Sequence, residues 1–323
     1  MPKRAYFSFT IGMITHGRLM KNMSRPKRII DAHQHVFWHG RDDASLVADL
    51  DANGIEKALL LTWYIHPTEG HAGYEGVLNP VHTDWTGLNH PGLPLEDIVQ
   101  AKRHYPDRFI LGYAPHPLEP DAASRLEAAI KMYDIRAMGE LKCRLLLDDP
   151  RCIELFRLCA QYNLPVILHI DVPYLPNEQT GKMMYFPQWY GGTIENLERA
   201  IQTCPETNFI AHGPGFWREI SSDADTSPGI YPDGPIVPPG RVEILMENYR
   251  NLYLDLSAFS ALNALKRDIE YSKYLIGKYH ERILFGRDYF GDDLHRFLQS
   301  LDLPEEISEN IYHRNAERLF KIQ

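Results

Sequence analysis

The sequence predicts one (β/α)8 barrel of the TIM type over residues 28–323. From residue 28 onward, short apolar runs alternate with amphipathic stretches, a pattern typical of strand–helix units around a parallel sheet. Eight such strands occur, each followed by a helix, and a barrel of about 250 residues tolerates insertions of the size needed here. The three longest connections all follow strands, which places them on the barrel face where active sites are built.

Each element has its own local signal. We expect strands at residues 28–35, 55–63, 109–115, 135–142, 165–171, 208–212, 251–257 and 282–288. Amphipathic patterns predict helices at residues 45–53, 95–105, 120–133, 150–162, 194–202, 241–249, 261–279, 293–300 and 304–320. Gly54 is suited to cap the first helix and Pro120 to begin the third. The long loops span 64–93, 172–192 and 213–240. An open doubly wound sheet is the alternative, but no Gly-x-Gly-x-x-Gly or Gly-x-x-x-x-Gly-Lys motif accompanies the strands.

Composition excludes several classes of function. The 323 residues are 44% hydrophobic, as expected of a globular protein with a substantial core. The 34 basic and 43 acidic residues leave a net charge of −9, and no block of Lys and Arg is long enough to follow a phosphate backbone, which argues against nucleic acid as a partner. Cys143, Cys152, Cys159 and Cys204 lack Cys-x-x-Cys spacing, so a reducing cytoplasmic compartment fits best.

The first 27 residues do not fit the barrel pattern, and we expect a poorly ordered N-terminal extension at residues 1–27. The alternative is an export signal, because Lys3 and Arg4 precede a mostly apolar run, although no small-residue cleavage site follows. No stretch reaches the 18 to 20 or so apolar residues of a membrane span, so we expect no membrane partner.

The first strand runs from two branched apolar residues into Asp31-Ala32-His33-Gln34-His35. Because side chains alternate along a strand, Asp31, His33 and His35 are expected to share one face. Two neighbouring imidazoles can bind one divalent metal ion such as zinc, iron, manganese, nickel or cobalt. Taken alone, the pair is weak evidence for a metal, and surface or hydrogen-bonded histidines are the alternative.

Polar residues recur where other predicted strands end, namely Glu140, Lys142, His169, His212 and Asp288. In a barrel these ends meet at one mouth. A histidine ending one strand is usually structural, and Asp288 alone could cap a helix. Several buried ionisable groups collected at one mouth are costly without a compensating cation, so together they favour a metal centre.

Five segments resemble the amidohydrolase superfamily. They are Asp31 to His35, Leu164 to His169, Phe209 to Gly213, Ile283 to Asp288 and Asn315 to Phe320. The resemblance covers about residues 28–320 and is to the amidohydrolase-related branch, which includes metal-dependent hydrolases, lactonases and non-oxidative decarboxylases. It implies His33, His35, His169 and Asp288 as metal ligands, with His212 as a ligand or proton-transfer residue.

The resemblance leaves the fourth strand open, because some relatives place a bridging lysine or glutamate there and others bind one ion. Glu140 and Lys142 share a strand face, so either could reach the mouth, and an ion pair between them is the alternative. We expect one divalent ion, most plausibly Zn²⁺, with a second possible through Glu140.

Substrate contacts are expected from Lys142, Arg144, Arg287, Trp63 and Trp217. The two guanidinium groups suit a substrate carboxylate, although Arg287 has the opposite strand parity to Asp288, and a structural ion pair is the alternative for both. The loops are rich in aromatic and histidine residues, including His66, His71, Tyr74, Trp85, Tyr185, Trp189 and Tyr190. These suit a pocket for a small cyclic or aromatic acid, or equally loop packing or a subunit contact.

The predicted function is a metal-dependent hydrolase that uses activated water on an amide, ester or lactone, with Asp288 and His212 as catalytic groups. A decarboxylase of the same resemblance is the first alternative, and a non-catalytic metal- or ligand-binding barrel is the second. A homodimer is possible by analogy with other barrels.

Overall fold

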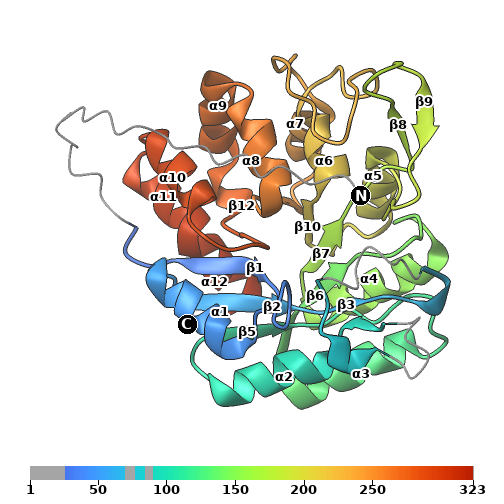
Figure 1. The fold of residues 1–323 in the computed structure, drawn as a ribbon, viewed down its shortest axis with the longest axis vertical. Coiled ribbons are helices and arrows are strands. Elements are labelled where there is room, and N and C mark those ends of the chain that lie inside the picture. Colours follow the sequence, from blue (N-terminus) through green and yellow to red (C-terminus); the bar gives the residue numbers. More distant parts are fainter. Residues whose placement is uncertain (1–25, 70–76, 84–89, 323) are drawn as a thin grey trace, which may run out of the picture.

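The computed structural model describes residues 26–69, 77–83 and 90–322, so most of the predicted N-terminal extension and the loop residues His71, Tyr74 and Trp85 lie outside it. Eight parallel strands form one sheet in the order β1-β2-β5-β6-β7-β10-β11-β12. Figure 1 shows helices around these strands, and the predicted (β/α)8 barrel is confirmed. Among the described residues, no helix is long and apolar enough to cross a lipid bilayer.

The barrel strands are short, and their bounds lie inside the predicted ranges. They are β1 (Ile30–Gln34), β2 (Lys57–Leu61), β5 (Phe109–Gly112), β6 (Ile135–Leu141), β7 (Val166–His169), β10 (Phe209–His212), β11 (Leu252–Asp255) and β12 (Ile283–Leu284). The main helices are α1 (Asp43–Ala52), α2 (Leu95–His104), α3 (Ala122–Tyr133), α4 (Pro150–Tyr162), α5 (Ile194–Thr203), α7 (Arg241–Asn248), α8 (Ala258–Lys266), α9 (Ile269–Tyr279), α10 (Asp293–Ser300), α11 (Glu305–Glu309) and α12 (Asn315–Phe320).

The long loops contain structure that was not predicted. In the first, β3 (Trp63–Tyr64) pairs antiparallel with β4 (Gly92–Leu93). In the second, β8 (Tyr174–Pro176) and β9 (Met183–Tyr185) form a hairpin. The third holds the short helix α6 (Pro214–Trp217). The predicted helix 261–279 is two helices, and 304–320 is interrupted by a π-helical turn at Asn310–Arg314.

Closure of the barrel depends on hydrogen bonds between the first and last strands. The Ala32 amide donates to the Phe285 carbonyl (2.8 Å), and the Asp288 amide donates to the His33 carbonyl (2.8 Å). Although β12 is only two residues long, these bonds extend its pairing to Asp288. The contact therefore holds His33 of the first strand beside Asp288 of the last.

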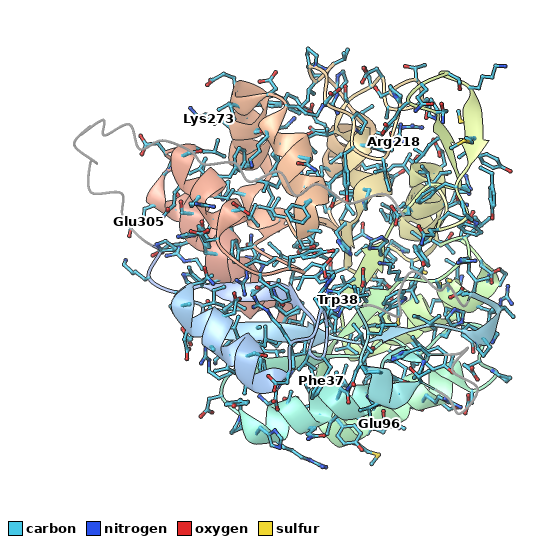
Figure 2. All side chains as sticks on the ribbon, viewed as in Figure 1. Phe37, Trp38, Glu96, Arg218, Lys273 and Glu305 are labelled. Carbon is cyan, nitrogen blue, oxygen red and sulfur yellow. The ribbon has the colours of Figure 1, made fainter. Side chains whose placement is uncertain are left out.

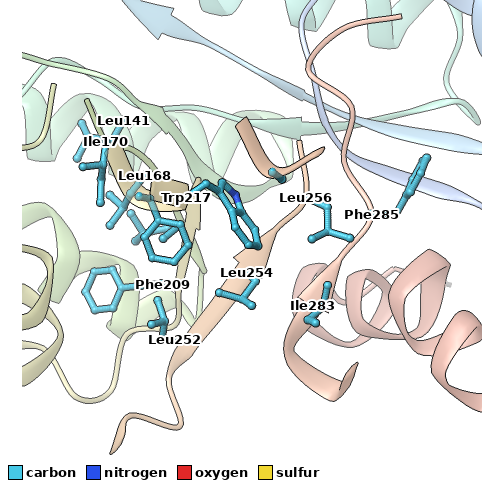
Figure 3. Close-up of a cluster of buried hydrophobic side chains, with 14 of the residues drawn as sticks. Leu141, Leu168, Ile170, Phe209, Trp217, Leu252, Leu254, Leu256, Ile283 and Phe285 are labelled. Carbon is cyan, nitrogen blue, oxygen red and sulfur yellow. The ribbon is translucent and has the colours of Figure 1, made fainter. Parts of the chain in front are cut away.

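The core has an inner and an outer layer. Inside the barrel lie alternate strand residues such as Leu59, Ile167, Ile210 and Leu284, with Phe320 of α12 below them. The residues between them pack outward against the helices, and Figure 3 shows part of this outer layer around Trp217. The outermost positions are charged, as for Lys273 and Glu305 on the outer helices in Figure 2. This period-two alternation determines which strand residues reach the mouth.

Candidate metal centre

On several strands the inner apolar layer is followed, two residues further along, by a polar residue. His169 follows Ile167 on β7 and His212 follows Ile210 on β10, while Asp255 is the last residue of β11. Because side chains of a strand repeat every two residues, these groups project into the barrel at its C-terminal end. His33, Glu140, His169, His212 and Asp255 are all nearly inaccessible to solvent.

The first strand departs from this alternation, and one prediction fails there. The pairing of β1 with β2 shifts register between Asp31 and Gln34, so Asp31 does not share a face with His33 and His35. Its carboxylate instead accepts hydrogen bonds from the Arg287 side chain (2.6 Å) and from the Gln34 side-chain Nε2 (2.9 Å). The irregularity turns both imidazoles into the barrel while Asp31 joins the strand to its neighbour.

One group of potential ligands consists of His33, His35 and Asp288. The Nε2 atom of His35 lies 3.4 Å from an Asp288 carboxylate oxygen, and that of His33 lies 3.9 Å from the same oxygen. Asp288 has a φ of 58°, a left-handed conformation that aspartate tolerates better than most residues and that is common at functional sites. The three predicted ligands from the first and last strands are therefore brought together.

A second group consists of Glu140, His169 and His212. One Glu140 oxygen lies 2.8 Å from His169 Nδ1 and 2.7 Å from His212 Nε2. The other lies 3.5 Å from His35 Nε2, which joins the two groups. The structure thus places His169 beside Glu140 rather than within the first group, and Glu140 stands between the candidate ligands.

Three supporting residues were not predicted: Asp255, Ser257 and Asp171. Asp255 lies 2.7 Å from His33 Nδ1, and Ser257 Oγ lies 3.0 Å from His212 Nδ1 and 2.9 Å from Asp255. Asp171 lies 2.8 Å from His169 Nε2. Asp171 ends the predicted strand 165–171 and Asp255 lies near the end of the predicted strand 251–257, so the signal that identified His169 and Asp288 could have found them.

Gly286 leaves the room that this arrangement needs. A Cβ atom at this position would lie 2.5 Å from an Asp255 carboxylate oxygen and 3.0 Å from the His33 Cβ. The first distance is shorter than side-chain packing allows, and the second is unusually tight. The glycine therefore permits Asp255 and His33 to approach each other across the strand end.

The electrostatics of the site call for a cation. Burial works against the charge on Glu140, but Lys142 and the hydrogen bonds from His169 hold its pKa well below the usual range. Burial likewise opposes ionisation of Asp255, but His33 lowers its pKa. Burial and the charge of His33 lower the pKa of His212. Ionised carboxylates among buried imidazoles need a partner charge.

The hydrogen bonds of His33 and His35 suit a divalent metal ion. The Nδ1 atom of His33 is bound to Asp255, whereas its buried Nε2 atom has no hydrogen-bond partner. Metal-ligating imidazoles characteristically bind a carboxylate or carbonyl through one nitrogen and the metal through the other. His35 repeats this arrangement, because its Nδ1 lies 2.9 Å from the Leu61 carbonyl and its Nε2 faces Asp288.

Two of the predicted substrate-binding residues lie beside this centre. The Lys142 ammonium lies 4.6 Å from the centre of the Trp63 ring and 5.3 Å from that of Tyr190. Trp63 also donates its indole N–H to the Lys142 carbonyl (3.0 Å). The Lys142 charge acts on both Glu140 and His169, which places it near the second ligand group.

The structure does not bring Arg144, Arg287 and Trp217 to the site. Arg144 donates from its backbone amide to the Glu69 carboxylate (2.6 Å) and from its guanidinium to the Glu69 carbonyl (3.1 Å). Arg287 is buried in ion pairs with Asp31 and Asp49. These two arginines therefore hold loop and strand segments in place, which is the structural alternative noted from the sequence.

Trp217 lies in the outer hydrophobic core, between Leu168 and Leu256 in Figure 3. Its side chain is almost completely buried, and the indole N–H donates to the Asp255 carbonyl (3.0 Å). A large apolar side chain on a four-residue helix that covers the barrel is buried by packing, so the residue supports the backbone of Asp255 from outside the barrel.

A family model described as Amidohydrolase matches residues 30–322 of this chain. No curated protein matches the sequence. Solved structures with the same fold include 5-carboxyvanillate decarboxylase from Sphingomonas paucimobilis, which is 18% identical with a TM-score of 0.58 over 92% of this chain and 99% of that one. The 2,6-dihydroxybenzoate decarboxylase from Rhizobium is also 18% identical, with a TM-score of 0.54 over 91% and 98% of the two chains.

A hydrolase is similar to the same extent. A probable 2-pyrone-4,6-dicarboxylic acid hydrolase from Acinetobacter baumannii is 14% identical, with a TM-score of 0.57 over 91% of this chain and 100% of that one. At these identities the likeness concerns the fold, and the fold accommodates both reactions.

Proposed function

Because the chain belongs to the amidohydrolase family, we propose that it is a metal-dependent hydrolase of an amide, ester or lactone. The observation that supports this most is the buried, unpartnered Nε2 of His33, which stands opposite the Asp288 carboxylate beside His35. We propose His33, His35, His169 and Asp288 as ligands, with Glu140 available to hold a second ion beside His169 and His212.

Zn²⁺ is the ion we propose, because nitrogen-rich sites with one or two carboxylates suit it. Mn²⁺ is the competing candidate, since a related 5-carboxyvanillate decarboxylase structure is complexed with manganese. When bound, either ion supplies a Lewis acid that polarises a substrate carbonyl and acidifies water.

The protein's own residues supply proton transfer and orientation. Asp288, partly open to the mouth, accepts the proton released by the attacking water and returns it to the leaving group; such transfers accelerate reactions by about a hundred- to ten-thousandfold. His212 is held by Ser257 at Nδ1 and by Glu140 at Nε2, a fixed position from which its imidazole would orient the substrate oxygen. Lys142, stacked on Trp63, provides a cation for a substrate carboxylate.

A non-oxidative decarboxylase is the second candidate, and one observation favours it. Lys142 lies between two aromatic rings next to the ligand groups, an environment suited to an aromatic carboxylate. Two solved structures of similar fold are decarboxylases of such acids. In that reaction Asp288 would deliver a proton to the ring carbon that loses carbon dioxide.

Product analysis distinguishes the two. Purified enzyme reconstituted with Zn²⁺ or Mn²⁺ is incubated with a pyrone-type lactone dicarboxylate and, separately, with hydroxybenzoates, and both ring-opened acid and carbon dioxide are measured. Hydrolysis without carbon dioxide supports the proposal, whereas stoichiometric carbon dioxide supports the alternative. Asp288→Asn should abolish either activity, while Asp292→Asn, an exposed carboxylate four residues on, should leave it unchanged. Loss in both variants alike would contradict the role of Asp288.

We further propose that the enzyme acts in the cytoplasm on a small molecule, with residues 1–27 as an extension outside the barrel, and that it forms a homodimer. The four cysteines are all buried and unpaired by disulfides, which agrees with a reducing compartment. Fractionation of cells and light scattering of the purified protein test the two statements.

A further inference from the structure

A cavity lies at the opposite end of the barrel from the candidate metal centre. It has a volume of about 450 Å³, within the range of small-molecule sites. Its walls include Lys57, the first residue of β2, Phe109, the first of β5, and Arg136, the second of β6. These are the amino ends of the strands, whereas His169 and His212 lie at the carboxyl ends, so the cavity is separate from the proposed active site.

The cavity is basic in a protein that is acidic overall. Four cationic residues line it and only two acidic ones do, although the chain carries a net charge of −9. The cationic residues are Lys57, Lys102, Arg136 and Lys321, and the acidic ones are Asp107 and Asp134. A concave surface of one sign concentrates ions of the opposite sign.

The positive charge of the cavity is incompletely neutralised. Arg136 forms an ion pair with Asp134 through Nη2 (2.9 Å), but its buried Nε atom has no hydrogen-bond partner. The Lys102 ammonium donates to the backbone carbonyls of Pro106 and Phe109 rather than to a carboxylate. Burial lowers the pKa of Lys102, and the charges of Lys57 and Arg136 lower it further, although Asp134 and Asp107 act in the opposite direction. A concave lining with four cationic and two acidic residues is suited to an anion.

We propose that this cavity is a second ligand site that binds a phosphate group, either free phosphate or the phosphate of a small ester. Arg136 supplies a planar set of N–H donors, and the lysines supply point charges that match the three oxygens of a phosphate. The space beyond the charged groups, bounded by Tyr133 and Ile322, accommodates an organic part of the ligand. This phosphate site does not take part in the proposed reaction. Absence of phosphate binding would therefore leave the proposed hydrolase function untouched, and absence of hydrolase activity would leave the phosphate site untouched.

The test is calorimetric titration of the metal-loaded enzyme with inorganic phosphate and with adenosine monophosphate. Both probes are expected to bind at one site per chain, and tighter binding of the nucleotide would identify an ester as the ligand class, whereas equal affinity would identify free phosphate. The variant Arg136→Gln/Lys321→Gln should weaken binding at least about tenfold, because two charged donors are lost.

Matched variants keep this test decisive. The control variant Lys266→Gln/Arg250→Gln removes two exposed cations elsewhere and should leave the affinity for phosphate unchanged. Titration with chloride in place of phosphate, at equal ionic strength, should give only the background heat. If Arg136→Gln/Lys321→Gln fails to fold, Lys321→Gln alone, at an exposed position after α12, gives the same comparison. The proposal is overturned if neither probe binds, or if both pairs of variants weaken binding equally.

Discussion

Replacing Asp255 by asparagine should reduce metal affinity although it preserves the size of the side chain. In the structure one Asp255 oxygen accepts from the Ser257 amide (2.8 Å), and the other lies 2.7 Å from His33 Nδ1. The Ser257 N–H requires an acceptor, so the asparagine carbonyl must take the first position and the NH₂ group the second. An NH₂ donor facing Nδ1 favours the imidazole tautomer with its proton on Nε2, the nitrogen assigned to the metal.

The expected magnitude follows from the burial of this pair. Loss of a supporting carboxylate behind a metal-bound histidine typically weakens metal binding about 10- to 100-fold, or about 1.4 to 2.7 kcal/mol. Both partners are nearly inaccessible to solvent, so water cannot replace the lost acceptor. We therefore expect Asp255→Asn to bind metal at least as weakly as Asp255→Ala.

Competition between the protein and a chelator for Zn²⁺ or Mn²⁺ measures this effect, with unfolding of the metal-free proteins as a check on integrity. Asp97→Asn is the matched control, because Asp97 is a buried carboxylate that lies 2.9 Å from His82 outside the site. An Asp255→Asn protein whose metal affinity stays within about twofold of the wild type would refute the tautomer argument.

The remaining predictions concern stability and the space at the site. Arg287→Gln leaves the buried Asp31 carboxylate without its cation, whereas Asp49 keeps Arg41 (3.2 Å), and it should destabilise the fold by about 3 to 5 kcal/mol in urea unfolding with KM unchanged. A rise in KM at unchanged stability would instead support a substrate-binding role for Arg287. Burial raises the pKa of Glu219 from 4.5 to about 7. As the pH rises between these values, the unfolded chain releases the Glu219 proton while the folded chain keeps it, so the free energy of unfolding falls. Relative to Glu219→Gln, this loss should approach about 3 kcal/mol between pH 4.5 and 8; parallel pH profiles would contradict it. Gly286→Ala should displace Asp255 and lower the metal content of the protein, as measured by elemental analysis. A Gly286→Ala protein with full metal content would show that the space beside Asp255 is not needed.

Much of the barrel was predictable because alternation between apolar strands and amphipathic helices is a local signal. The positions at which the strands end were less predictable. The predicted strand 282–288 pairs as a regular strand only over two residues, because its later residues bond to β1 individually. The small sheet formed by β3 and β4 joins segments separated by a long loop, and no local pattern specifies such a pairing.

The site was predictable where chemistry and strand ends coincide, as for His169, His212 and Asp288. It was not predictable where a register shift intervenes, and the shift in β1 separates Asp31 from the imidazoles that follow it. Parity correctly suggested that Arg287 faces away from Asp288, yet sequence alone could not reveal its buried partners. Trp217 was misassigned because a tryptophan in a loop gives no local sign of whether it faces substrate or core.

Above all, we propose that His33 and His35 hold a catalytic metal ion. Elemental analysis of the purified protein, before and after reconstitution, tests it most directly in wild type, His33→Ala/His35→Ala and the control Asp97→Asn. We predict one or two divalent ions per chain in the wild type and the control, and none in the double variant at equal folded yield. Full metal content in the double variant, or none in the reconstituted wild type, would contradict the claim.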